Sequence, residues 1–203
     1  AKEQERGKTT NLSIFNNDHL YFSWNRSKKT PDLIKVYLPK KLAPKEKIKL
    51  GLNYDVKIPS NKFTKFGFDE FGNMNLKSWF LTAARYDNHQ FTNYSNENLD
   101  DIANAITNFD IEIKVANNFS VTTDLDTNEE INTEDYTIYK LSGKNRVDFS
   151  LFIDSKSDFT NFKSDNFEVI TNLDGDKITP EDQAQAIDCV VRFVKKTIGD
   201  YPF

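Results

Sequence analysis

The chain has 203 residues, and its 27 Lys and Arg against 31 Asp and Glu give a formal net charge of −4. This balance excludes a dedicated nucleic-acid-binding protein, which would carry a basic excess, and no apolar run is long enough for a transmembrane segment. One cysteine excludes an internal disulfide framework. The two histidines, His19 and His89, lie far apart in sequence, so the pattern predicts no metal site in this chain.

The first part of the chain predicts β-strands. Residues 12–15 and 19–24 are rich in apolar residues and flank the turn signal Asn-Asn-Asp at 16–18, so they predict a hairpin. Residues 32–38 predict a strand bounded by two prolines. Residues 47–58 alternate with period two and give the clearest strand, because one face collects the apolar side chains: Ile48, Leu50, Leu52, Tyr54, Val56 and Ile58.

The middle of the chain is less regular and then returns to strands. Residues 60–105 are rich in Asn, Asp and aromatic residues, and residues 99–106 predict a short helix. Further strands are predicted at 109–115, 136–141, 146–153 and 167–171, separated by turns at 117–118, 124–135 and 142–143. Short alternating strands with turn punctuation predict an antiparallel β-sandwich.

One amphipathic helix is predicted near the C-terminus. Thr179 is suited to the N-cap and Pro180 to the first helical position, with acidic residues in the first turn. Two lysines lie in the last turn, and Gly199 follows it. Apolar residues recur every three or four positions and predict one apolar face over residues 180–198: Ala184, Ile187, Val191, Val194 and Ile198. Cys189 is expected to be a buried small apolar residue within this helix.

No motif in the chain predicts catalysis. Residues 124–135 loosely resemble a calcium loop but lack the glycine that its sharp turn needs, so they are interpreted as a solvated acidic turn. Residues 172–176 are interpreted in the same way. The aromatic residues of 63–80 are compatible with a binding face, and core packing is the interpretation that we favour. The sequence thus predicts no catalytic, cofactor-binding or metal-binding residue.

Several segments nevertheless resemble, in order, the N-terminal domain of the gluzincin zinc metallopeptidases, the aminopeptidase N and leukotriene hydrolase relatives. Residues 39–48 (PKKLAPKEKI) resemble the "LP-x-PL-x-PGE" turn, and 54–59 (YDVKIP) resemble the "Y-x-V-x-IP" strand. Residues 66–68 are similar to an "R-x-G" turn. Residues 76–87 resemble the "WYP-x-x-A-x-YD" segment of a secreted bacterial branch, although Leu81 replaces its proline.

The resemblance continues to the end of the chain. Residues 109–119 resemble a "F-D-V-x-I-x-x-P-x-N" strand without its proline, and 146–154 resemble "V-x-D-F-A-W-F-A". Residues 198–203 (IGDYPF) resemble the "G-x-YP" ending of the first catalytic-domain helix, and 2–7 are like a segment inside the N-terminal domain. Because the sequence ends directly after this helix, we expect a piece of a longer protein.

The resemblance implies a saddle of antiparallel strands that packs on a catalytic domain and helps to close its substrate cleft. It divides the chain into a partial N-terminal β domain over 1–175 and a linker with the first catalytic-domain helix over 176–203. The parent would be a zinc-dependent aminopeptidase whose HExxH helix lies beyond this chain, so no zinc and no activity are expected in the chain itself. Its partners would be its own catalytic domain and the parent's peptide substrate.

The resemblance also suggests a surface and a location. Trp79, Phe80, Arg85 and Tyr86 are the candidate cleft-side or interface residues, and a core position under a loop is the competing interpretation for Trp79. The parent is expected to be secreted, periplasmic or associated with the cell envelope, and residues 1–6 contain no signal-peptide core. The alternative function is a complete secreted β-sandwich that binds a glycan, a lipid or a protein without enzymatic activity. A third interpretation is a parent that has lost its metal.

Overall fold

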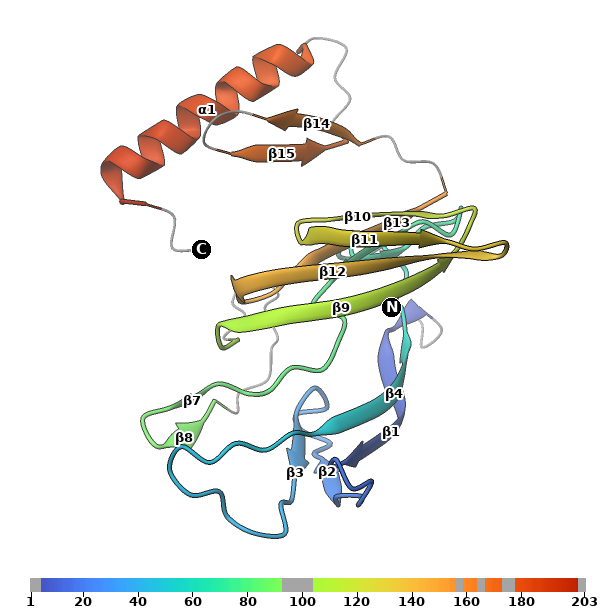
Figure 1. Ribbon diagram of the computed structural model, residues 1–203, viewed down its shortest axis with the longest axis vertical. Helices are drawn as coiled ribbons and strands as arrows, with labels where there is room; N and C mark the ends of the chain where they lie inside the picture. The colour runs from blue at the N-terminus through green and yellow to red at the C-terminus, as the bar shows by residue number, and fades with distance from the viewer. Residues whose placement is uncertain (1–4, 93–103, 156–158, 164–166, 173–177, 201–203) are drawn as a thin grey trace. The chain divides into compact units, whose positions relative to one another are not determined.

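The computed structural model describes residues 5–92, 104–155, 159–163, 167–172 and 178–200 (Figure 1). The chain is mainly β with antiparallel sheets, and a single helix in the described residues lies near the C-terminus, so the predicted fold class is confirmed. It divides into two compact units, Ala1–Asp69 with Leu76–Ile106 and Glu70–Asn75 with Thr107–Phe203. The boundary expected at residue 176 stays a prediction.

The first unit is built on the antiparallel pairing of β1 (Lys8–Phe15) with β4 (Gly51–Lys57). Ile14 on β1 is almost fully buried. The Phe15 ring lies over Gly51, where a Cβ atom would come within 2.3 Å of Phe15 Cε2. Glycine at this position therefore leaves the space that the aromatic ring occupies. The predicted strand over 47–58 is confirmed over Gly51–Lys57, and Ile48 lies exposed before β4 begins.

The hairpin predicted from residues 12–15 and 19–24 forms over a short stretch next to its turn, where the Phe22 N–H donates a 2.8 Å hydrogen bond to the Ile14 carbonyl. The Asn16 turn does form, because Asn16 Oδ1 accepts hydrogen bonds of 2.9 Å from the backbone N–H groups of Asp18 and Leu20. Beyond the turn, Tyr21 makes an isolated bridge to Phe15. The chain then forms β2 (Trp24–Arg26), which pairs with β3 (Ile34–Val36). The alternating strand β4 offers β1 a longer ladder than the residues directly after the turn.

The rest of the first unit consists of short strands: β5 (Gly67–Phe68), the end of β6 (Met74–Lys77), β7 (Tyr86–Asp87) and β8 (Gln90–Phe91). Gly67 has a φ of +130°, and a Cβ there would lie 2.1 Å from the carbonyl oxygen of Pro59, so only glycine fits. Most of the helix predicted over 99–106 lies outside the described residues. At its end, Asn104 bridges to Ala84 instead.

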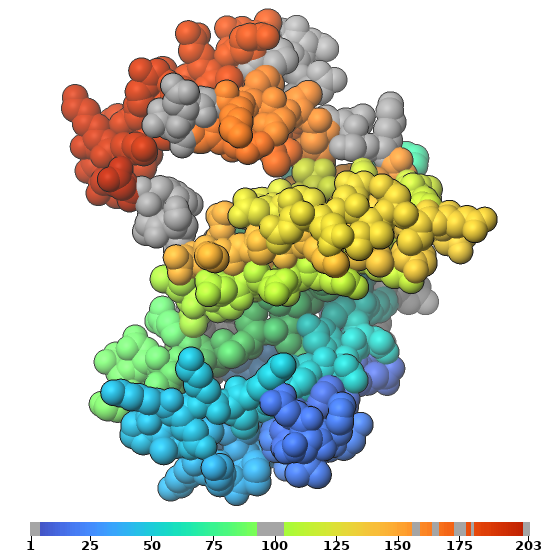
Figure 2. Space-filling model, in the orientation of Figure 1, coloured from blue at the N-terminus to red at the C-terminus, as the bar shows by residue number. Residues whose placement is uncertain are grey.

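The second unit contains a three-stranded antiparallel sheet in the order β11 (Asp126–Asn132), β12 (Tyr136–Arg146) and β9 (Thr107–Ala116). Figure 2 shows β9 in lime green along one border of the yellow and orange β11–β12 pair. Tyr139 and Leu141 of β12 are buried on one face. Burial and the nearby Glu130 carboxylate raise the pKa of Tyr139. The strands predicted at 109–115 and 136–141 are confirmed.

The opposite face of this sheet carries a ladder of alternating charges. Lys140 lies opposite Glu129 on one side and Glu112 on the other. Its Nζ is 2.7 Å from Glu129 Oε2. The hydrogen bond and charge of Glu129, with a further contribution from Glu112, raise the pKa of Lys140. Cross-strand pairs of opposite charge stabilise a sheet at such positions.

Two predicted turns are wrong, because both segments belong to this sheet. The acidic segment 124–135 forms β11, and residues 142–143 lie inside β12. β11 is mostly exposed, so it lacks the apolar alternation that identifies a half-buried strand. Gly143 is buried inside β12 because Leu125 packs against its backbone, so here glycine marks a close approach.

A second sheet of this unit pairs β10 (Ser120–Thr123) with β13 (Ser150–Asp154), and β6 lies next to β13. Leu151 and Phe149 are buried, and the Phe149 ring meets the Phe109 ring edge-on at 5.1 Å. The strand predicted at 146–153 is thus split between the end of β12 and β13. Thr123 Oγ1 donates a 2.7 Å hydrogen bond to the Ser150 carbonyl.

The C-terminal part contains the hairpin β14 (Thr160–Lys163) and β15 (Glu168–Thr171), then α1 (Pro180–Thr197). The predicted helix start is confirmed as a capping box, in which Thr179 Oγ1 accepts from the Asp182 N–H and Asp182 accepts from the Thr179 N–H. No helix in the described part of the chain combines the length and apolar character that crossing a membrane requires.

The apolar face expected on α1 is partly covered and partly exposed. Ile187, Val191 and Val194 are half-buried, whereas Ile198 is 83% exposed. The expected burial of Cys189 is wrong, since this thiol is exposed. The helix carries apolar residues on a second face, where Val190 and Phe193 are also exposed.

Candidate binding surface

The residues selected from the sequence lie in one segment of the first unit, residues 79–91, which we call the aromatic segment. At its start, the rings of Trp79 and Phe80 meet edge-on with centroids 5.6 Å apart, and both side chains are half-buried. The Nε1–H of Trp79 is buried and meets no hydrogen-bond acceptor among the described residues. Buried indole N–H groups usually have a partner, so this donor is unusual.

Two contacts fix the chain after Phe80. The backbone N–H of Leu81 donates a 3.2 Å hydrogen bond to the hydroxyl of Tyr54, which comes from β4. Thr82 Oγ1 donates to Asn104 Oδ1 at 3.3 Å, next to the bridge between Ala84 and Asn104. The exposed part of the aromatic segment is therefore tied at its base to the β1–β4 sheet and to residue 104.

The end of the aromatic segment is a tight hairpin. Asp87 pairs with Gln90, and Asn88 and His89 between them have φ values of 47° and 63°. Positive φ at both central residues is the pattern of a type I′ turn, for which Asn is well suited. The Thr92 N–H donates a 2.8 Å hydrogen bond to the Arg85 carbonyl and extends the ladder by one pair.

This hairpin presents two aromatic rings to solvent. Tyr86 lies opposite Phe91, with ring centroids 5.0 Å apart and planes at 68°. Tyr86 is 60% and Phe91 is 63% exposed. Paired exposed rings offer a large apolar contact area with little side-chain entropy to lose on binding.

The structure groups the predicted residues in two pairs. Trp79 pairs with Phe80, and Tyr86 pairs with Phe91, while Arg85 has an exposed side chain and contributes its carbonyl to the hairpin. Phe91 was not among the predicted site residues. The signal for it was local, because two aromatic residues flank Asp-Asn-His-Gln, whose Asn favours a two-residue turn that places them opposite each other on paired strands.

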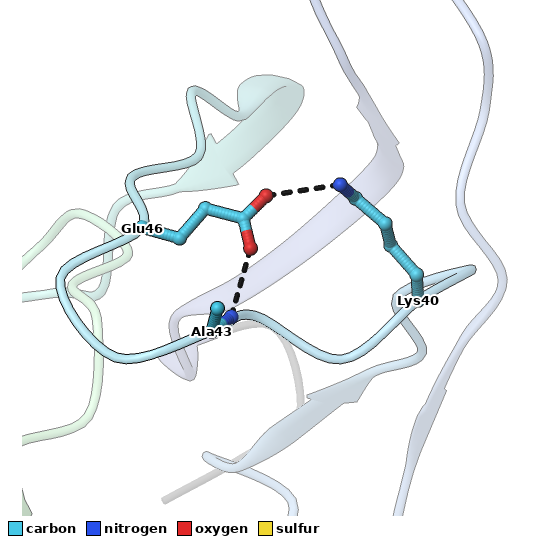
Figure 3. Close-up of polar contacts among 3 residues, drawn as sticks. All are labelled: Lys40, Ala43 and Glu46. Atoms are coloured by element: carbon cyan, nitrogen blue, oxygen red, sulfur yellow. Dashed lines mark hydrogen bonds and ion pairs between the residues drawn. The ribbon is translucent and has the colours of Figure 1, made fainter.

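The turn at residues 39–48 contains a second polar arrangement (Figure 3). Glu46 Oε2 accepts a 2.8 Å hydrogen bond from the Ala43 N–H, and Glu46 Oε1 lies 3.0 Å from Lys40 Nζ. The Ala43 hydrogen bond and the Lys40 ammonium lower the pKa of Glu46 below its usual value. The Glu46 N–H also donates to the Ala43 carbonyl at 3.0 Å and closes the turn.

Lys45 adopts a conformation that favours glycine in this turn. Pro44 occupies the second position of the Ala43–Glu46 turn, and Lys45 in the third position has a φ of 67°. Proline followed by a positive φ is the pattern of a type II turn, in which the third residue is usually glycine. The lysine therefore occupies a backbone conformation that costs it free energy.

The residues considered for metal binding do not converge. No group of three or more His, Cys, Asp or Glu in the described residues is placed to hold a metal ion. His19 stacks on Phe15 at 5.7 Å, and His89 lies in the turn of the β7–β8 hairpin. Asp124 Oδ1 accepts a hydrogen bond from the Ser150 N–H. Most of segment 172–176 lies outside the described residues.

Comparison of the chain with protein-family models, with curated proteins and with solved structures found no match in any of the three.

Proposed function

We propose that this chain is a non-catalytic β module of an aminopeptidase-like zinc metallopeptidase, in which the aromatic segment forms part of a contact surface for peptide. The observation that carries the proposal is the exposed Tyr86–Phe91 ring pair on a hairpin tied to the β1–β4 sheet. It lies in the part of the sequence that resembles the family's "WYP-x-x-A-x-YD" segment. Catalytic zinc would be supplied by an HExxH helix of the parent.

Two further features support this assignment. The Pro-Lys-Glu turn at 44–46 has the positive φ that suits the Pro-Gly-Glu of the resembled family. Helix α1 leaves Val190, Phe193 and Ile198 exposed, an apolar surface suited to a further domain. With this assignment, the parent acts outside the cytoplasm, as a secreted, periplasmic or cell-envelope protein.

The first test is the coding sequence of the parent together with its activity. An in-frame HExxH after this region, stoichiometric zinc and release of N-terminal residues from peptides are the expected results. A parent reading frame without HExxH would rule out an active zinc peptidase. An HExxH position without zinc ligands would instead indicate a parent that has lost its metal.

The second test addresses the surface itself in the parent protein. Tyr86→Ala and Phe91→Ala remove ring area that contacts peptide equally in the ground and transition states, so KM should rise several-fold with kcat unchanged. Phe63→Ala is the matched control, because Phe63 is also an exposed ring of the first unit and lies outside the aromatic segment. Equal effects of all three variants would contradict a specific surface.

The same ring pair also favours a second candidate function, a secreted module that binds a glycan, lipid or protein without enzymatic activity. Aromatic rings exposed on a rigid hairpin suit stacking on sugar rings as well as on peptide. Calorimetric titration of this chain with glycans would detect such binding, and Tyr86→Ala should abolish it. Binding by this chain, together with a reading frame that lacks HExxH, would favour this function over the first.

A further inference from the structure

The strand β9 lies at one edge of the β11–β12–β9 sheet and has no strand on its outer side among the described residues. The Asn117 N–H donates to the Asp135 carbonyl next to the antiparallel β9–β12 pair, so residue 117 directs its peptide groups toward the β12 side. Along an antiparallel strand the backbone N–H and C=O groups of successive residues point to opposite sides. The peptide groups of Val115, Ile113 and Ile111 therefore also point toward β12. The peptide groups of Asp110, Glu112 and Lys114 therefore face outward.

An edge of this kind is a template for a further strand unless something protects it. Charged side chains are one common protection, and β9 carries three on its exposed face: Asp110, Glu112 and Lys114. Their signs differ, however, so their effect depends on what lies opposite them. Against a second β9 strand, some registers would bring like charges together and others would pair opposite charges.

We propose that the outer edge of β9 pairs antiparallel with β9 of a second copy of this chain, about a two-fold axis at Ile113. This register places Glu112 opposite the second copy's Lys114, and Lys114 opposite its Glu112. It also sets Ile111 against Val115 on the apolar face, and Ile113 against itself. A two-fold interface of this kind uses the same patch of both copies and closes as a dimer.

The neighbouring registers all bring like charges together. A two-fold axis at Ile111 would place Glu112 opposite Asp110 twice. An axis at Glu112 would place Asp110 opposite Lys114 twice, but it would also place the Glu112 carboxylate opposite its own copy at the centre of the contact. An axis at Lys114 would bring the two ammonium groups together. Like charges directly opposite each other destabilise a sheet, and opposite charges stabilise it. Of these registers, only the one centred on Ile113 pairs opposite charges without also placing like charges opposite each other.

The charge ladder on the same face extends across the proposed contact. Glu129, Lys140 and Glu112 alternate in sign from β11 to β9. In the proposed register, the next residue beyond Glu112 is Lys114 of the second copy, which continues the alternation. Lys114 keeps its own contact, because its Nζ lies 3.4 Å from the centroid of the Tyr136 ring. The outward peptide groups of Glu112 and Lys114 would gain partners in the second copy.

The proposal is tested by the mass of the chain in solution, measured by sedimentation over a concentration series up to about 1 mM, because a short strand pair forms a weak dimer. The mass should rise from 23.5 kDa toward twice that value. Glu112→Lys alone and Lys114→Glu alone should each weaken dimerisation about tenfold or more. An equimolar mixture of these two variants should dimerise again, because opposite charges then face each other.

Controls separate this effect from a loss of fold or a change in net charge. Asp126→Lys makes the same charge change as Glu112→Lys on the opposite edge strand, β11, and should leave the dimer intact. Circular dichroism of each variant checks that the β structure persists. A wild-type chain that stays monomeric throughout would overturn the proposal. A dimer that survives both charge reversals would also overturn it, and would direct attention to the exposed face of α1.

A cross-link tests the register directly. Ile113 faces its own copy at a non-hydrogen-bonded position, where the Cα atoms lie about 4.5 Å apart, within the range that a disulfide spans. In a Cys189→Ser background, Ile113→Cys should give a disulfide-linked dimer on oxidation with diamide. Ile111→Cys should not form this disulfide, because residue 111 of the second copy would lie about 13 Å away along the strand. Equal cross-linking of the two variants would contradict the register.

Discussion

Leu125 packs against the backbone of Gly143 so closely that a Cβ on Gly143 would lie 2.5 Å from Leu125 Cδ2. Leu125 is only 6% exposed and has little room to move away. Gly143→Ala should therefore lower the free energy of unfolding by about 1–3 kcal/mol, the range for overpacking a core. Chemical denaturation measures the change. Gly199→Ala is a useful contrast, because nothing lies within 4 Å of its Cβ position and its penalty would arise from its positive φ alone.

The turn that contains Lys45 offers a stabilising substitution. Lys45→Gly removes the penalty of a left-handed conformation at φ 67° and adds backbone entropy to the unfolded chain, and the first effect is the larger. We expect a net gain of about 0.5–1 kcal/mol in the free energy of unfolding. Lys47→Gly, with no positive φ to relieve, should be neutral or destabilising. Equal effects of the two variants in chemical denaturation would contradict this explanation.

The Glu46 carboxylate should make the stability of this turn depend on pH. Because its pKa is lowered in the folded chain, Glu46 contributes stability above its unfolded-state pKa and loses it as the pH falls through the lowered folded value. Side-chain carboxyl NMR shifts should therefore show Glu46 titrating below the ordinary pKa of a glutamate. Lys40→Ala should move the Glu46 pKa back upward without returning it fully, because the Ala43 N–H remains.

The capping box at the start of α1 should contribute measurably to the helix. Thr179→Ala removes the acceptor of the Asp182 N–H and should cost about 1 kcal/mol of stability. Thr179→Ser keeps an oxygen in place and should cost little. Amide hydrogen exchange in the first turn of α1 reports the difference. Unchanged protection in the alanine variant would show that other contacts hold this helix end.

Local signals predicted the elements that depend on neighbouring residues. Thr179, Pro180 and Asp182 define the helix start through contacts within one turn, and the alternation of β9 identifies a strand with one covered face. The partner of β1 could not be predicted in this way. The end of β1 contacts residues 21–22 as the local pattern predicts, but most of the strand pairs with the distant β4, which no local pattern records.

The remaining errors have physical causes as well. β11 is an exposed edge strand, and its acidic and polar residues are as suitable for a turn as for a strand without a covered face. Cys189 lies beside Val190 on a helix with apolar residues on two faces, so periodicity alone does not choose which face is covered. At the candidate surface, the resemblance selected Trp79 and Tyr86. The partnership of Tyr86 with Phe91 depends on the turn between them.

The register of β1 with β4 has a consequence for how the chain folds. Paired residues of β1 and β4, such as Lys8 and Lys57, are farther apart in the sequence than paired residues of β9 and β12, such as Val115 and Thr137. The β1–β4 pairing must therefore close a longer loop. Loop closure costs entropy before contacts form, and distant pairings slow folding. We expect pulse-labelled hydrogen exchange during refolding to protect the amides of β9 and β12 before those of β1. The middle of the chain would then organise first, and its N-terminal strand would be among the last to order.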